Sequence, residues 1–303
     1  MLVMLTLNVL QPPDWDTTHE LYFGQRLVVD HELVWTREFH DKPPFVSMFY
    51  GLAGATQQFV WVQVMTLLAV LAAMMAVVRL APGLGISARY PAKLQYAVRG
   101  FAAVLLPTVW VTLQGGMFNI NVPATALALV ALLVVMQPGI PALRYVLVGS
   151  VCAALAISMR PYHVAPLAVG VLWAGACFGF ASSAGAAWRV RTARAMAVYV
   201  LWGGMIGLWG ALFNVVPYVL TQQMPAFVDG LAMLAGGNIP NNGLRGFVAA
   251  MVDVKIAAFW LVFVGVAALV TVPFCRVGQV GRWVVLYLLC SVALATVILQ
   301  VHS

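Results

Sequence analysis

Charged residues are scarce in this chain, and carboxylates are the scarcest. Only 8% of the 303 residues are charged, 63% are hydrophobic, and the mean hydropathy is +0.95. No polar stretch is long enough for a separate soluble domain. These values exclude an ordinary soluble protein and predict an all-α, polytopic membrane protein whose residues 1–303 form a single transmembrane domain.

Several familiar chemical motifs are also absent. The sequence has no P-loop, no dinucleotide fingerprint and no Ser/His/Asp pattern. Its cysteines lie in apolar runs without metal-ligand spacing, which favours buried free thiols, at Cys152, Cys177, Cys275 and Cys290. His19-Glu20 and His31-Glu32 each begin a zinc-protease helix motif, but neither has the second histidine. We therefore predict no metal site and no cofactor; a divalent cation is left open, although no ligand motif supports one.

Long apolar runs are what the chain has instead. A helix of about 20 apolar residues crosses a hydrocarbon core of ~30 Å. Runs of this kind predict spans at 58–80, 95–114, 120–137, 142–159, 162–181, 196–217, 254–274 and 283–301. The shorter stretch 45–56 is predicted to be a re-entrant or interfacial helix. Met1 to Leu10 is too short to span, so we interpret it as the end of an incomplete first span or as a wrong start; the total is about eight to nine spans.

The basic residues predict the orientation of these spans. The net charge of +7 is distributed unevenly over the alternate connections. Ten basic residues fall in one set, namely Arg79, Arg89, Lys93, Arg99, Arg144, Arg189, Arg191, Arg194, Arg276 and Arg282, against six in the other. By the positive-inside rule the first set is cytoplasmic. The acidic loop 11–43, the breaks at 114–121 and 159–163, and a second loop at 218–253 then share the outer face.

The acidic loop holds most of the carboxylates. Seven of the nine acidic residues lie between Asp14 and Asp41. Asp14-Trp15-Asp16 crowds the predicted membrane boundary, where carboxylates are costly and mark candidate sites. Thr17-x-x-Glu20 fits a capping box that opens a helix at about 17–31, which is the structural alternative for Glu20.

Three further outer positions carry polar side chains beside prolines. Lys42 precedes two prolines that hold its backbone extended, so it is either an interfacial lysine or a cation held for phosphate. Asn119 and Asn121 precede Pro123, and N-capping by Asn121 is the structural interpretation. Arg160 lies in a very short turn without an acidic neighbour and requires an anionic partner, either protein or ligand. In the second outer loop, a short apolar helix is predicted at 226–235.

The order of these features resembles the GT-C membrane glycosyltransferases, particularly their protein-mannosyltransferase and aminoarabinose-transferase branch. The resemblance covers roughly residues 11–170. It consists of an early acidic position (Asp14-Trp15-Asp16), a Lys-Pro-Pro motif before an apolar helix (Lys42-Pro43-Pro44-Phe45), a second outer break, and a later basic residue (Arg160). The acidic residue usual in the second break is here an amide, Asn119 or Asn121.

The resemblance implies transfer of a sugar from a polyprenyl-phosphate donor to a lipid, glycan or protein acceptor. The implied location is the outer face of a membrane, expected to be a bacterial inner membrane. Asp16 is expected to be the general base, with Asp14 second, and Lys42 and Arg160 to bind the phosphate. Further substrate contacts are expected from Glu20, Asn119, Asn121, Tyr162 and His163. The alternatives are a non-catalytic relative in a polysaccharide-assembly complex and a membrane transporter or flippase.

Overall fold

A computed structural model of the chain describes residues 15–36, 42–56, 58–80, 119–135, 137, 143–160, 163–176, 178–179 and 187–237. Several predictions fall outside these residues. They concern Asp14, Tyr162, the segment 1–10, the runs 95–114, 254–274 and 283–301, and the second outer loop after residue 237. The side chain of Asp16 is also outside the described part, although its backbone belongs to the first described helix.

The described part of the chain is helical and contains no strand, which confirms the all-α prediction. Its helices, in chain order, are α2 (Trp15–Val29), α3 (Pro44–Thr56), α4 (Val60–Leu80), α6 (Asn121–Val135), α7 (Leu143–Met159), α8 (Val164–Ala176), α9 (Trp188–Asn214), α10 (Val216–Leu220) and α11 (Met224–Gly237).

Most predicted helical runs in the described part coincide with a helix. The runs at 58–80, 120–137 and 142–159 correspond to α4, α6 and α7, and the short helix at 45–56 corresponds to α3. By length and composition, α9 is the one described helix that is long and apolar enough to cross a membrane. It begins at Trp188, ahead of the predicted 196, because a helix continues through its arginines without needing apolar residues there. The number of spans therefore stays a prediction.

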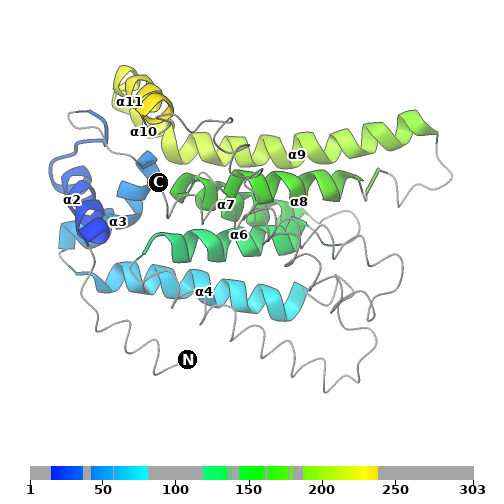
Figure 1. Cartoon of the computed structure of the whole chain (residues 1–303), viewed down its shortest axis with the longest axis horizontal. Helices are drawn as coiled ribbons and strands as arrows, with labels where there is room; N and C mark the ends of the chain where they lie inside the picture. Colours follow the sequence, from blue (N-terminus) through cyan, green and yellow to red (C-terminus); the bar gives the residue numbers. More distant parts are fainter. Residues whose placement is uncertain are drawn as a thin grey trace, which may run out of the picture.

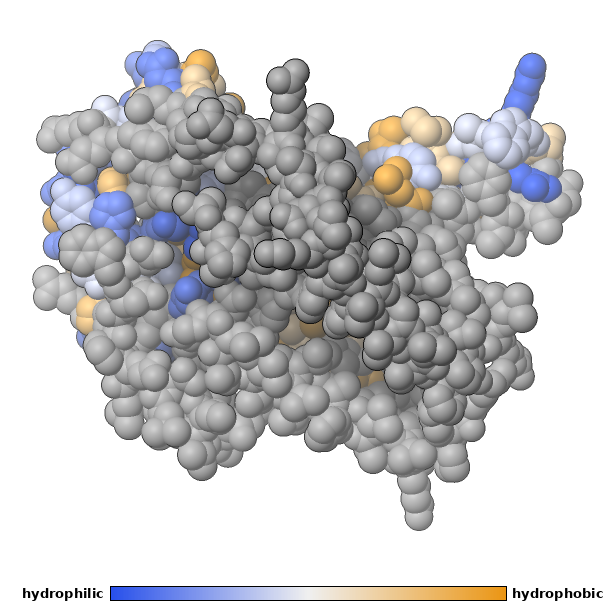
Figure 2. Space-filling view, viewed as in Figure 1, coloured by the Kyte–Doolittle hydropathy of each residue, from blue (hydrophilic) through white to orange (hydrophobic). Residues whose placement is uncertain are grey.

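The helices form a bundle with a distinct cap at one end. In Figure 1, α4, α6, α7, α8 and α9 run along the long axis, whereas α2 and α3 lie at one end together with α10 and α11. The first turns of α9 lie at the opposite end. Figure 2 shows hydrophilic side chains at both of these ends, over α2 and over the start of α9. The acidic segment and the arginines of α9 are thus separated by the length of the bundle.

The main core lies between α4, α6, α7 and α9. Small and branched apolar side chains from these helices form one buried cluster around Trp202, which is 1% exposed. A Cβ on Gly149 of α7 would lie 2.7 Å from the Trp202 ring, so glycine is required for this approach. This packing fixes α9 against the bundle.

Glycines also permit the close packing of α2 on α3. A Cβ on Gly24 would lie 2.7 Å from the backbone of Tyr50, and one on Gly54 would lie 2.5 Å from the backbone nitrogen of Gln25. Side chains at these positions would force the helices apart. The α2–α3 pair is therefore held backbone to backbone, and this contact positions the candidate site.

Candidate functional site

A buried ion pair joins α2 to the segment before α3. The Lys42 ammonium nitrogen lies 3.1 Å from Glu20 Oε1, and the two side chains are 11% and 2% exposed. Charges this deeply buried require a partner, because an isolated buried charge costs several kcal/mol (about 3–5 when one partner is removed). The structure therefore brings together two residues predicted for the site, Glu20 and Lys42.

This pairing changes the interpretation of Glu20. Helix α2 begins at Trp15, so Thr17 lies within its first turn and is not the residue that precedes the helix. The helix thus begins two residues before the predicted start at Thr17, because helix ends are less sharply defined by sequence than helix interiors. Glu20 acts as an ion-pair partner of Lys42. Position 16, predicted to be the base, lies one helical turn before position 20 on α2.

Asn214, at the last position of α9, connects two of the predicted segments. Its Oδ1 accepts a hydrogen bond from the backbone N–H of Phe45 at 3.2 Å. Its Nδ2 donates to Ser158 Oγ at 2.7 Å and to the Gly210 carbonyl at 3.0 Å. Phe45 N–H is one of the first donors of α3, which have no partner inside the helix. A single amide thus ties the chain just after Lys42 to the chain just before Arg160.

Asn119, rather than Asn121, accepts the capping hydrogen bond at the start of α6. The N–H of Asn121 donates to Asn119 Oδ1 at 2.9 Å, and the N–H of Val122 donates to the Asn119 carbonyl at 3.0 Å. Helix α6 begins at Asn121, so the prediction that Asn121 caps it was wrong by two residues. The side chain of Asn119 performs the capping because it precedes the helix and can accept from its free N–H groups.

Arg160 is half-buried in the turn between α7 and α8. Its Nε is buried and has no hydrogen-bond partner among the described residues. His163, which is 3% exposed, lies in the same turn, with its Nε2 3.4 Å from Thr125 Oγ1 of α6. Arg160 therefore presents a cation to this end of the bundle, whereas His163 is built into the packing between α6 and α8.

One buried cluster underlies all of these positions. It contains Leu21, Val46, Ile120 and Met159, together with apolar residues of α3, α4 and α6. Leu21 follows Glu20, Ile120 separates the two asparagines, and Met159 precedes Arg160. Val46 is the third residue of α3 and lies four residues after Lys42. Residues distant in sequence thus meet at one end of the bundle.

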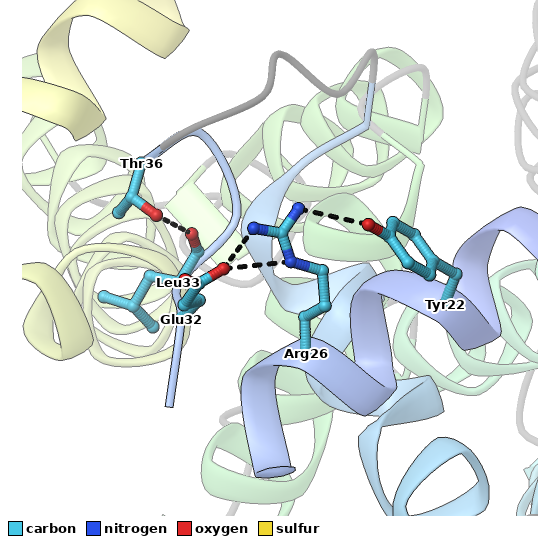
Figure 3. A network of polar contacts seen from close by, with 5 residues as sticks. All are labelled: Tyr22, Arg26, Glu32, Leu33 and Thr36. Carbon is cyan, nitrogen blue, oxygen red and sulfur yellow. Dashed lines mark hydrogen bonds and ion pairs between the residues drawn. The ribbon is translucent and has the colours of Figure 1, made fainter. Parts of the chain in front are cut away.

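A separate polar network fixes the loop after α2. Figure 3 shows the Arg26 guanidinium between Tyr22 and Glu32, and Thr36 bonded to the Leu33 carbonyl. The N–H groups of Asp30 and Glu32 both donate to the Arg26 carbonyl, and His31 has a positive φ of 56° that ends the helix. The Arg26 guanidinium is thus paired with the Glu32 carboxylate, whereas the buried Nε of Arg160 has no hydrogen-bond partner among the described residues.

The same loop packs against α10 and α11. Trp35 is buried. Its backbone has a positive φ of 72°, which is a rare conformation for a bulky residue. The centroid of the Trp35 ring lies 5.9 Å from that of Phe227. A Cβ on Gly230 would lie 2.3 Å from the Trp35 ring. Tyr218 donates its hydroxyl to the Val34 carbonyl, and burial raises the pKa of this phenol. The two predicted outer loops are therefore in contact through their described parts.

No group of three or more His, Cys, Asp or Glu side chains that could hold a metal ion occurs in the described part of the chain. In comparisons with known proteins, no family model matches this chain, and no curated protein or solved structure shows a significant similarity to it. The resemblance to the GT-C glycosyltransferases thus rests on the sequence motifs and on their order along the chain.

Sequence reasoning missed Asn214. Its signal was an isolated amide at the end of an apolar run, three residues before Pro217. Such a residue has no motif around it, and its partners are distant in sequence: Phe45 and Ser158. Its role becomes visible only when α3, α7 and α9 are placed together.

Proposed function

We propose that this chain transfers a sugar from a polyprenyl-phosphate donor to a lipid, glycan or protein acceptor at the outer face of a membrane. The supporting observation is the single buried cluster that contains the chain neighbours of Glu20, Asn119 and Arg160 together with Val46, four residues after Lys42. A transferase needs a carboxylate and cations at one place, and this end of the bundle supplies both types of group.

The proposed reaction is a displacement at the anomeric carbon. The acceptor hydroxyl attacks, its proton passes to a carboxylate, and the bond between the anomeric carbon and the phosphate oxygen breaks. We assign the carboxylate to Asp16, with Asp14 as the alternative. Negative charge develops on the departing polyprenyl phosphate and is stabilised by Arg160 and Lys42.

The proposal includes a topology. About eight to nine spans would cross the membrane, with the α2–α3 and α10–α11 segments outside. The arrangement in Figure 1 supports this orientation, because these segments lie together at the end opposite the arginine-rich start of α9. An outer site would receive the lipid carrier from the bilayer, with its phosphate at the level of Arg160.

The proposal is tested by a transfer assay with radiolabelled polyprenyl-phosphate sugars. Membranes containing the chain should move label to an endogenous acceptor and release polyprenyl phosphate. Arg160→Met and Lys42→Met should lower this rate by more than tenfold, which corresponds to about 1.4 kcal/mol. Arg189→Met is the matched control, because Arg189 is exposed at the opposite end of the bundle.

Other outcomes would replace the proposal. Binding of the carrier without any transfer would indicate a non-catalytic relative. Movement of the labelled lipid across the membrane without transfer would indicate a flippase. Wild-type rates in both cation variants would show that neither side chain stabilises the phosphate.

A further inference from the structure

The two cations assigned to the phosphate differ in what they contact. Lys42 lies 3.1 Å from the Glu20 carboxylate, so its charge is already balanced. The buried Nε of Arg160 has no hydrogen-bond partner in the part of the chain that the structure describes. An incoming anion can therefore bind the Arg160 guanidinium directly, whereas the Lys42 ammonium is already paired with Glu20.

Both cations belong to the same end of the bundle. Asn214 binds Phe45, three residues after Lys42, and Ser158, two residues before Arg160. Val46 and Met159 also share one buried cluster. An anion that reaches Arg160 is therefore close to the segment that carries Lys42.

Glu20 and a bound phosphate would compete for the same ammonium group. Both are anions, and their mutual repulsion is strong where the side chains are shielded from water. Glu20 is 2% exposed and borders the apolar cluster through Leu21. Release of Lys42 to a ligand thus requires the Glu20 carboxylate to give up its cation, which costs free energy.

We infer that Glu20 is a built-in competitor that holds Lys42 until a phosphate displaces it. The phosphate binds first to Arg160 and then takes Lys42 from Glu20. This rests on the proposed function for the identity of the anion, a polyprenyl phosphate. Glu20 is in this account a positioning residue: it lowers the affinity for the carrier and makes occupation of Lys42 depend on the ligand.

The test measures binding of a radiolabelled polyprenyl phosphate to the purified full chain in detergent. Glu20→Gln should bind at least about tenfold more tightly than wild type, because the competing charge is gone. Glu20→Asp should show a smaller gain, since it keeps the charge but shortens the reach to Lys42. Arg160→Met should bind at least about tenfold more weakly.

Two controls separate competition from a general change of charge or fold. Asp229→Asn removes an equal charge from an exposed position on α11, at the same end of the bundle, and should leave affinity unchanged. The double variant Glu20→Gln/Lys42→Met should not show the higher carrier affinity of Glu20→Gln, because it has no Lys42 ammonium to release. Uncharged polyprenol should bind all variants equally, and inorganic phosphate should compete with the carrier.

The outcomes distinguish this inference from the proposed function. Wild-type binding without a gain in Glu20→Gln and Glu20→Asp would overturn the competitor role and leave the proposed function standing. A gain of equal size in Asp229→Asn would also overturn it. No binding of the carrier by any folded variant would reject both proposals. Thermal unfolding of each variant establishes that it is folded. If Glu20→Gln does not fold, the affinity of Glu20→Asp decides whether Glu20 competes for Lys42.

Discussion

Replacing Asn214 by alanine should weaken the junction between α3, α7 and α9. The amide makes hydrogen bonds to Phe45 at 3.2 Å, to Ser158 at 2.7 Å and to Gly210 at 3.0 Å. The first two join different helices. The bond to Ser158 is expected to contribute about 1 kcal/mol, and loss of the bond to Phe45 costs about 1–3 kcal/mol because its N–H is left without a partner. Asn214→Ala should therefore lower the free energy of unfolding by about 2–4 kcal/mol.

A double-mutant cycle isolates the part of this effect that depends on geometry. Unfolding is measured in detergent for Asn214→Ala, Ser158→Ala and the double variant. The coupling energy should be about 1 kcal/mol, because the two side chains are bonded to each other. Asn214→Asp is the matched control: it keeps the acceptor for Phe45 but loses the donor to Ser158. Additive effects within about 0.3 kcal/mol would refute the bridging role.

Two further predictions concern the packing and the topology. Gly230→Ala should lower the free energy of unfolding by about 1–3 kcal/mol, because its Cβ would lie 2.3 Å from the Trp35 ring. Gly203 faces open space, so Gly203→Ala should have little effect. Equal effects of the two substitutions in thermal unfolding would contradict this packing. In a cysteine-free background, an impermeant thiol reagent applied from outside should label a cysteine at the exposed position Leu220 and not one at the exposed position Val190. External labelling at Val190 would reverse the orientation.

Helix positions were the most predictable part of the fold. Long apolar runs such as 58–80 and 142–159 correspond closely to α4 and α7. The extent of an apolar run can be determined directly from the sequence, without any knowledge of tertiary contacts. Helix starts were less predictable. Thr17 and Asn121 both match capping preferences, but α2 and α6 begin at positions that place both residues inside the helix. Capping residues have similar propensities at neighbouring positions, so the sequence does not select among them.

Residues proposed for the candidate site were selected from the sequence, but their contacts were not predicted. Lys42 and Arg160 stood out because cations beside prolines in an apolar chain are rare. The partner of Lys42 was not predictable, since Glu20 and Lys42 belong to α2 and the segment before α3, whose close packing Gly24 and Gly54 permit. Such an approach depends on tertiary packing, which local sequence patterns do not specify.

Turnover of the Asp16→Asn variant tests the central proposal of a sugar transferase most directly. An amide has the shape of the carboxylate and can still favour the helix start, but it cannot take the acceptor proton. We predict that Asp16→Asn lowers transfer from the polyprenyl-phosphate sugar by about 10²–10⁴-fold while carrier binding and thermal unfolding stay at wild-type values. Asp14→Asn is the matched control and should retain most of the activity. Wild-type turnover in both variants would contradict the proposal that either aspartate is the base.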